Sequence, residues 1–92
     1  MSVKIRFFAR FRELLGTEAI VEPAPGTSLS GLVRQVAGKN SEGYSAIFDE
    51  KGNFREFVIV MRNAKRVDTA GAAEIPVADG DDIAVFPPVA GG

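Results

Sequence analysis

The sequence predicts an α+β domain in which one main helix packs on one face of a mixed sheet of about five strands. Several short stretches, including Val3–Phe7 and Ile83–Phe86, are rich in β-branched or aromatic residues or alternate apolar with polar residues, as strands do. The clearest helical stretch, Leu29–Ala37, repeats its apolar residues at helical spacing over its whole length. Ninety-two residues are enough for one domain with one modest core.

The N-terminal stretch is predicted to form a half-buried strand. Its alternation places two sets of side chains on opposite faces: Val3, Ile5 and Phe7 toward the core, and Lys4, Arg6 and then Phe8 away from it. Residues 9–15 are predicted to make one or two helical turns that end at Gly16. Residues 17–22 then form a second strand, and the Pro- and Gly-containing residues 23–26 turn the chain.

The main helix has clear end signals. Thr27 or Ser28 is the expected N-cap, and Gly38 fits the C′ position, where a helix often closes in the left-handed conformation. Gly31 inside the helix costs about 1 kcal/mol relative to alanine. We expect close packing against the sheet to explain it.

The second half of the chain supplies the remaining strands. The expected elements are a short helical turn with Tyr44, Ile47 and Phe48, a turn at 49–53, a strand at 57–62, a tight turn at Asn63–Ala64, a short strand at 65–67, a loop at 68–74, an acidic turn at 79–82 and a last strand ending at Phe86. The order of strands and main helix is that of the β-grasp, or ubiquitin-like, fold.

Composition excludes several functions. The net charge of −1 leaves no basic excess for a nucleic acid backbone, so we expect no nucleic acid partner. There is neither an apolar run long enough for a membrane span nor a signal peptide pattern, and we expect a cytoplasmic protein. The absence of cysteine and histidine removes thiolate chemistry, cluster ligation and the usual general base.

Two charged clusters have alternative interpretations. Asp79, Asp81 and Asp82 resemble a cation site, but no EF-hand spacing surrounds them, and a solvated turn is favoured. Arg12 and Glu13 have the chemistry of an acid–base pair, but no second carboxylate or histidine accompanies them. A surface ion pair or a partner contact is favoured for them.

Phe8 and Phe86 are both expected on the face of the sheet away from the main helix. If the first and last strands are neighbours, the two rings form one exposed aromatic patch, which would mark a protein-binding face. Lys4, Arg6 and Arg10 are candidates for its rim, with a solubilising role as the favoured alternative. The alternative is that a loop covers both rings.

The C-terminal residues are predicted to form a flexible tail, residues 87–92, beyond a β-grasp domain of residues 1–86. Pro87 and Pro88 have no N–H, so they end the strand ladder and favour an extended exit. Val89 and Ala90 follow, and Gly91 and Gly92 carry no Cβ, so that a partner can close around the backbone. A frayed, glycine-rich terminus is the alternative.

These motifs resemble those of the MoaD family, the small subunits of molybdopterin synthase, whose relatives include thiamine sulfur carriers and small archaeal modifier proteins. The resemblance spans nearly the whole chain and rests on the N-terminal segment Phe7–Gly16, the strand and turn through Asn63, and above all the terminal segment Asp79–Gly92. The stretch from Gly38 to Arg55 is longer than in the shortest bacterial subunits and is similar to that of the archaeal modifiers.

The resemblance implies a carried protein rather than an enzyme. A ubiquitin-activating-type enzyme would use Mg-ATP to adenylate the Gly92 carboxylate, and a persulfide would convert it to a thiocarboxylate. The large synthase subunit would then deliver that sulfur to a pterin precursor. In a modifier, the activated Gly92 would instead acylate a substrate lysine.

On this interpretation the chain holds no tightly bound cofactor and no metal. Its predicted partner-binding residues are Phe8, Arg12 and Phe86. Two alternatives remain open from the sequence: a modifier as the main role, and a non-catalytic β-grasp interaction domain.

Overall fold

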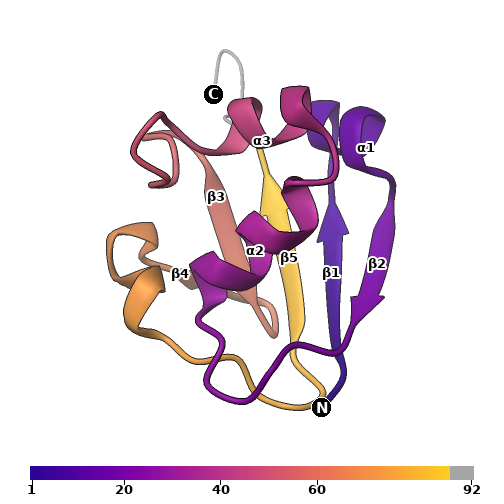
Figure 1. Ribbon diagram of the computed structural model, residues 1–92, viewed down its shortest axis with the longest axis vertical. Coiled ribbons are helices and arrows are strands. Elements are labelled where there is room, and N and C mark those ends of the chain that lie inside the picture. Colours follow the sequence, from indigo (N-terminus) through magenta and orange to yellow (C-terminus); the bar gives the residue numbers. More distant parts are fainter. Residues whose placement is uncertain (88–92) are drawn as a thin grey trace.

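The computed structural model describes residues 1–87, which form one five-stranded sheet with helices on one face (Figure 1). The elements are β1 Val3–Phe7, α1 Arg10–Leu15, β2 Glu18–Val21, α2 Leu29–Ala37, α3 Ser41–Ile47, β3 Ile59–Arg62, β4 Lys65–Val67, the 3-10 helix η1 Thr69–Glu74 and β5 Asp82–Phe86. The strand order is β2-β1-β5-β3-β4. The predicted α+β β-grasp fold is confirmed.

The first and last strands lie side by side at the centre of the sheet. β1 pairs with β5 in parallel, and the pairings of β1 with β2, of β3 with β5 and of β3 with β4 are antiparallel. As Figure 1 shows, α2 crosses the face of the sheet and α1 and α3 lie near the end where β1 and β5 finish. The strands nearest the two ends of the described chain are therefore hydrogen-bonded neighbours inside the sheet.

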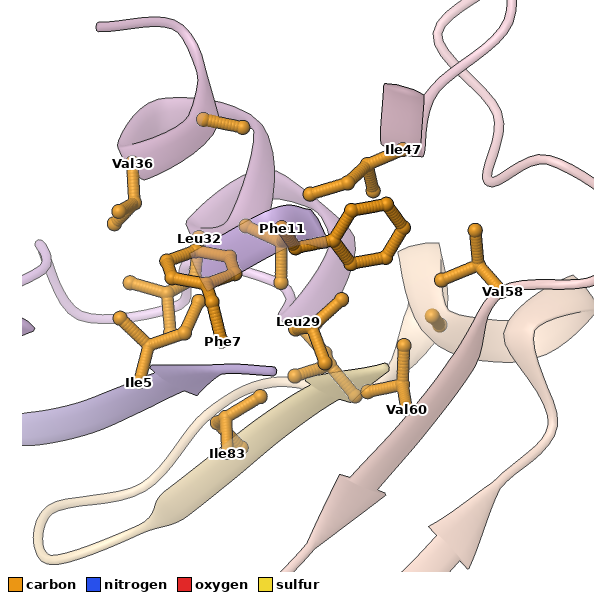
Figure 2. Packing of buried hydrophobic residues seen from close by; sticks show 14 of the residues in the cluster. Ile5, Phe7, Phe11, Leu29, Leu32, Val36, Ile47, Val58, Val60 and Ile83 are labelled. Atoms are coloured by element: carbon orange, nitrogen blue, oxygen red, sulfur yellow. The ribbon is translucent and has the colours of Figure 1, made fainter. Parts of the chain in front are cut away.

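The core fills the space between the sheet and α2. The inward residues of β1, Val3, Ile5 and Phe7, are at most 1% exposed, as predicted. They pack with the buried side chains of the other elements shown in Figure 2, which include Phe11, Leu29, Leu32, Ile47, Val58, Val60 and Ile83. This single continuous cluster holds the helices on one face and leaves the other face without a helix among residues 1–87.

Three predictions concern α2, of which the N-cap is confirmed and those for Gly38 and Gly31 are corrected. Ser28 is the N-cap, with its Oγ accepting a hydrogen bond from the Gly31 N–H at 3.0 Å. Gly38 is not left-handed, because its φ is −63°; a Cβ there would lie 3.1 Å from the Arg34 carbonyl oxygen. Gly31 does not pack on the sheet either, since a Cβ there would first meet the Ser28 Oγ at 3.0 Å.

Three other elements differ from the sequence-based expectations in their bounds or their type. The strand predicted at 57–62 begins only at Ile59, and Phe57 precedes it with 66% of its surface exposed. The short turn around Tyr44 is the seven-residue helix α3, capped by the Asn40 side chain. The predicted loop 68–74 is largely η1, whose N-cap Asp68 accepts from the Ala70 N–H at 3.0 Å. Small residues without an apolar repeat gave no signal for it.

The tight turn at Asn63–Ala64 is confirmed. Both residues have positive φ, 51° and 67°, as a two-residue hairpin between strands of right-handed twist requires. The Asn63 side chain also reaches the start of β5, where its Oδ1 accepts from the Asp82 N–H at 2.9 Å and its Nδ2 donates to Asp81. The hairpin is thereby fixed to the central strand.

Asp81 is a buried structural residue, so the prediction of a solvated turn is wrong for it. It is 5% exposed, and its carboxylate accepts from Arg62 Nε at 3.0 Å, Asn63 Nδ2 at 3.0 Å and the Ala78 N–H at 2.8 Å. Burial raises the pKa of Asp81, but these hydrogen bonds and the Arg62 charge outweigh it, so the pKa lies below the ordinary value of 3.8.

We expect Asp81→Asn to lower the free energy of unfolding by about 1–3 kcal/mol at pH 7, because an amide cannot accept from all three donors. Since the folded pKa is depressed, the stabilisation by the carboxylate is fully present above the unfolded pKa. It is lost as the pH falls through the folded pKa. Urea unfolding at pH 7 and at successively lower pH below 3.8 measures the difference between variant and wild type.

Asp79→Asn is the matched control. Asp79 lies in the same turn but is exposed, and among residues 1–87 its carboxylate accepts only from the Ser2 N–H, at 2.7 Å. We expect its effect to stay within about 0.5 kcal/mol. Equal effects of the two substitutions, or an Asp81→Asn deficit that does not shrink in acid, would contradict the role given to Asp81.

Candidate functional site

The uncovered face of the sheet presents a stack of two aromatic rings. Phe8 continues β1 by one residue, with its N–H donating to the Val85 carbonyl at 3.2 Å, and Phe86 ends β5. Their ring centroids lie 4.3 Å apart with an interplanar angle of 9°. Both side chains are half-buried, and the predicted pairing of the two rings is confirmed.

A strained turn separates Phe8 from the core. Ala9 has φ 53° and ψ −128°, a conformation that costs a non-glycine residue about 1–3 kcal/mol. The Phe11 N–H donates to the Phe8 carbonyl at 3.2 Å across this turn. The chain thereby passes directly from a ring on the open face, Phe8, to a buried ring, Phe11, and α1 begins beside the stack.

Apolar residues of β3 extend the stack. Ile59 pairs with Phe86 and Met61 pairs with Ala84, so alternation along β3 places both side chains on the same face as the rings. We call Phe8, Phe86, Ile59 and Met61 the open-face patch. All four are partly exposed, which is the property of a surface that can bury apolar area against another molecule.

Arg6 lies at the edge of the patch on β1. Its guanidinium carbon is 5.6 Å from the Phe8 ring centroid, and its Nε donates to Asp82 Oδ1 at 3.0 Å. The sequence indicated Arg6 only as one of several rim charges. The ion pair was missed because it depends on the register between β1 and β5, of which the sequence carries no direct signal.

Arg12 is not part of this cluster. It lies on α1, is exposed, and makes no ion pair with any residue in the range 1–87. The expected surface pair with Glu13 is therefore absent, because neighbouring side chains on a helix do not face each other. Its predicted role as a partner contact stays a prediction.

The tail is only partly described. Pro87 follows Phe86 directly and is half-buried, so the exit of the chain lies next to the open-face patch. The predictions made for Pro88, Val89, Ala90, Gly91 and Gly92 fall outside the described residues.

The rest of the described chain offers little chemistry. Residues 1–87 contain no group of three or more acidic, histidine or cysteine side chains placed to hold a metal ion. A hollow of about 480 Å³ on the helix side is lined by residues of α2, η1 and the loop between α3 and β3, among them Arg34, Asn53, Glu56 and Thr69. No helix in this range is long and apolar enough to cross a membrane.

The sheet order, the helix α2 across one face and the strand β5 that leads to the glycine pair define a ubiquitin-like protein of the β-grasp class. Within that class the chain belongs to the ThiS family, whose model matches residues 5–92. The match includes the tail as well as the folded domain.

Relatives over the full length carry two kinds of name. The chain is 33% identical to small archaeal modifier protein 3 of Haloferax volcanii, covering 100% of both chains. It is 32% identical to the molybdopterin synthase sulfur carrier subunit of Escherichia coli K12, covering 98% of this chain and 99% of the relative.

Two solved structures have the same fold as this chain. SAMP1 from Haloferax volcanii superposes with a TM-score of 0.85 at 25% identity over 100% of both chains. A chain from the complex of subunits 1 and 2 of the molybdopterin-converting factor of Helicobacter pylori gives a TM-score of 0.62 at 25% identity, again over 100% of both chains. The resemblance predicted from the sequence is confirmed.

The stacked geometry of Phe8 and Phe86 leads to a prediction about stability. We expect a double-mutant cycle of Phe8→Ala and Phe86→Ala to give a coupling of about 0.5–1.5 kcal/mol in the free energy of unfolding, because the stacked geometry adds to simple burial. A control cycle combines Phe8→Ala with Phe54→Ala, whose ring instead lies 4.7 Å from Phe48. We expect the control to be additive within about 0.5 kcal/mol, and equal couplings would contradict the stack.

Proposed function

We propose that this chain is a ubiquitin-like sulfur carrier in molybdopterin biosynthesis, with the carboxylate of Gly92 as the group that reacts. The observation that carries the proposal is the match to the ThiS family through residue 92, in a chain whose last strand, β5, ends at Phe86, six residues before Gly92. Its relatives of similar length bear the names of sulfur carriers and modifiers. The chain supplies the reacting group, and partner proteins supply the catalysis.

The chemistry begins with activation of a poor electrophile. A carboxylate oxygen of Gly92 attacks the α-phosphate of Mg-ATP held by a ubiquitin-activating-type enzyme, and pyrophosphate leaves. The acyl-adenylate has AMP as a good leaving group, and a persulfide sulfur of a partner displaces it. Cleavage of the sulfur–sulfur bond by a second partner thiol then leaves the thiocarboxylate, from which the large synthase subunit transfers sulfur to a pterin precursor.

The proposed parts of the chain have separate tasks. The fixed φ of Pro87 and Pro88 favours an extended chain, and a chain with fewer free conformers loses less entropy when it enters an active site. Gly91 and Gly92 make the end thin enough for a narrow channel. The open-face patch beside Pro87 supports docking, because a partner that covers it also stands over the exit of the tail.

A second candidate function is protein modification, in which the activated Gly92 acylates a lysine of a substrate protein. The relative named small archaeal modifier protein 3, matched over its whole length, favours it. Both fates use the same adenylation step, so they differ only in the nucleophile that displaces AMP.

Intact-mass measurement tests the proposal. The protein is incubated with the activating enzyme from its own organism, Mg-ATP and a sulfur donor, and we expect exchange of one oxygen for one sulfur at the C-terminus. Conjugates of higher mass in cell extract would favour the modifier. No ATP-dependent change of any kind would overturn both.

We expect Gly92→Ala to slow pyrophosphate exchange roughly tenfold or more, because a methyl group displaces the carboxylate within the channel. Deletion of Gly91 and Gly92 is expected to abolish exchange and to leave the melting temperature unchanged. An exchange rate for Gly92→Ala equal to that of wild type would contradict a tight channel. A large loss of thermal stability on deletion would show that the tail is part of the fold.

We expect Phe86→Glu to weaken binding to the activating enzyme by about 2 kcal/mol or more, since truncation of a central interface aromatic commonly costs this much. Ile20→Glu is the control, because Ile20 lies on the edge strand β2, outside the patch, and is 65% exposed. Circular dichroism checks that both variants fold. Unchanged affinity in a folded Phe86→Glu protein would exclude the open-face patch as the docking site.

A further inference from the structure

An unbroken row of contacts crosses β1 and β5 on the uncovered face. Asp82 Oδ1 accepts from Arg6 Nε at 3.0 Å, the Arg6 guanidinium lies 5.6 Å from the Phe8 centroid, and Phe8 stacks on Phe86 at 4.3 Å. An ion pair at one end is thus linked, through one arginine, to the aromatic stack at the other.

The register between the two strands produces this row. Lys4 pairs with Asp82 and Arg6 pairs with Ala84, so Asp82 lies diagonal to Arg6. Ala84 has only a methyl group, which leaves room for larger neighbours to lie over it, and it is 4% exposed. Arg6 is thereby held in one place by its strand neighbours on the same face.

Arg6 keeps most of its hydrogen-bonding capacity. A guanidinium has five N–H donors, and within residues 1–87 only Nε of Arg6 has a partner. The side chain is 41% exposed, so the terminal amino groups can meet another molecule. An arginine that is already fixed by a carboxylate and a ring loses little entropy when it binds a further group.

We propose that Arg6 determines partner specificity by binding a carboxylate of the partner. That carboxylate would lie at the edge of an apolar pocket of the partner that receives the Phe8–Phe86 stack. The partner is the activating enzyme, because both fates of Gly92 need that enzyme. This inference therefore rests on the proposed function. Asp82 is a positioning residue that acts through Arg6.

The surroundings favour a carboxylate on a protein over a polyanion. Asp82 contacts Arg6, and Glu18 lies opposite Arg6 in the β1–β2 register, so this part of the face carries acidic as well as basic groups. A nucleic acid needs several uncompensated cations in a row. A single carboxylate at the rim of an apolar pocket needs only one arginine next to exposed rings.

Binding kinetics with the purified activating enzyme test the role of Arg6. We expect Arg6→Met, which keeps an apolar stem over the rings, to weaken binding about tenfold or more and to reduce its salt dependence. Arg6→Lys keeps the charge without the planar fork, and its affinity is expected to lie between those of wild type and Arg6→Met. Lys4→Met is the matched control, because Lys4 is an exposed cation on the same face of β1 without an ion pair among residues 1–87, and its effect should stay within about twofold.

A double-mutant cycle tests the role of Asp82. We expect Asp82→Ala to raise the dissociation rate several-fold in the wild-type background, and to have no effect in the Arg6→Met background. An effect that persists without Arg6 would show that Asp82 acts by itself or on the fold, and would overturn its positioning role.

The outcomes separate this inference from the proposed function. If wild type is adenylated and bound but folded Arg6→Met is within twofold of it, with the same salt dependence, the role of Arg6 is overturned and the proposed function stands. If wild type is neither bound nor adenylated, the proposed function fails and the inference fails with it. If only the large synthase subunit discriminates against Arg6→Met, the choice of the activating enzyme as partner is wrong.

Discussion

The parallel pairing of β1 with β5 is the contact on which both faces of the molecule depend. Its register joins Ile5 with Ile83 and Phe7 with Val85, so that four apolar side chains point at the helices and are almost completely buried. Because side chains alternate along a strand, the same register carries the next residues, Phe8 and Phe86, to the opposite face. A slip of one residue would destroy the core and the ring stack together.

Most of this architecture could be predicted from the sequence, because it follows from local periodicity. Alternation in β1 and the helical repeat of Leu29–Ala37 are properties of neighbouring residues, and capping by Ser28 is a property of three or four. Asp81 shows where such reasoning fails. The residues around it read as a solvated acidic turn, but its partners Arg62 and Asn63 are 19 and 18 residues away in the sequence. Burial with distant partners leaves no local signal.

The candidate site shows the same division. That Phe8 and Phe86 face away from the helix followed from alternation, and that they meet followed from the guess that the first and last strands are neighbours. The ion pair of Arg6 with Asp82 could not be predicted in this way. Asp82 and Glu18 are both cross-strand neighbours of Arg6, and only the structure shows which of them forms the ion pair. Fold class therefore emerged from patterns, whereas the electrostatics of the face depended on register.

A buried carboxylate lies just before β5 and a partly exposed aromatic ring lies at its end, and the distance between them affects which substitutions the protein can accept. The buried Asp81 network lies just before the first residue of the strand, and the ring of Phe86 lies at its last. Five residues at about 3.3 Å each span more than 10 Å, beyond the range in which substitutions usually couple. A partner can therefore cover the Phe8–Phe86 stack and reach the tail at Pro87 without touching Asp81, which is buried and bonded to Asn63 of the β3–β4 hairpin. Because the ring stack lies away from the Asp81 network, Phe8 and Phe86 can change with the partner while that network stays the same. Asp82 connects the two regions, since its N–H donates to Asn63 and its carboxylate accepts from Arg6.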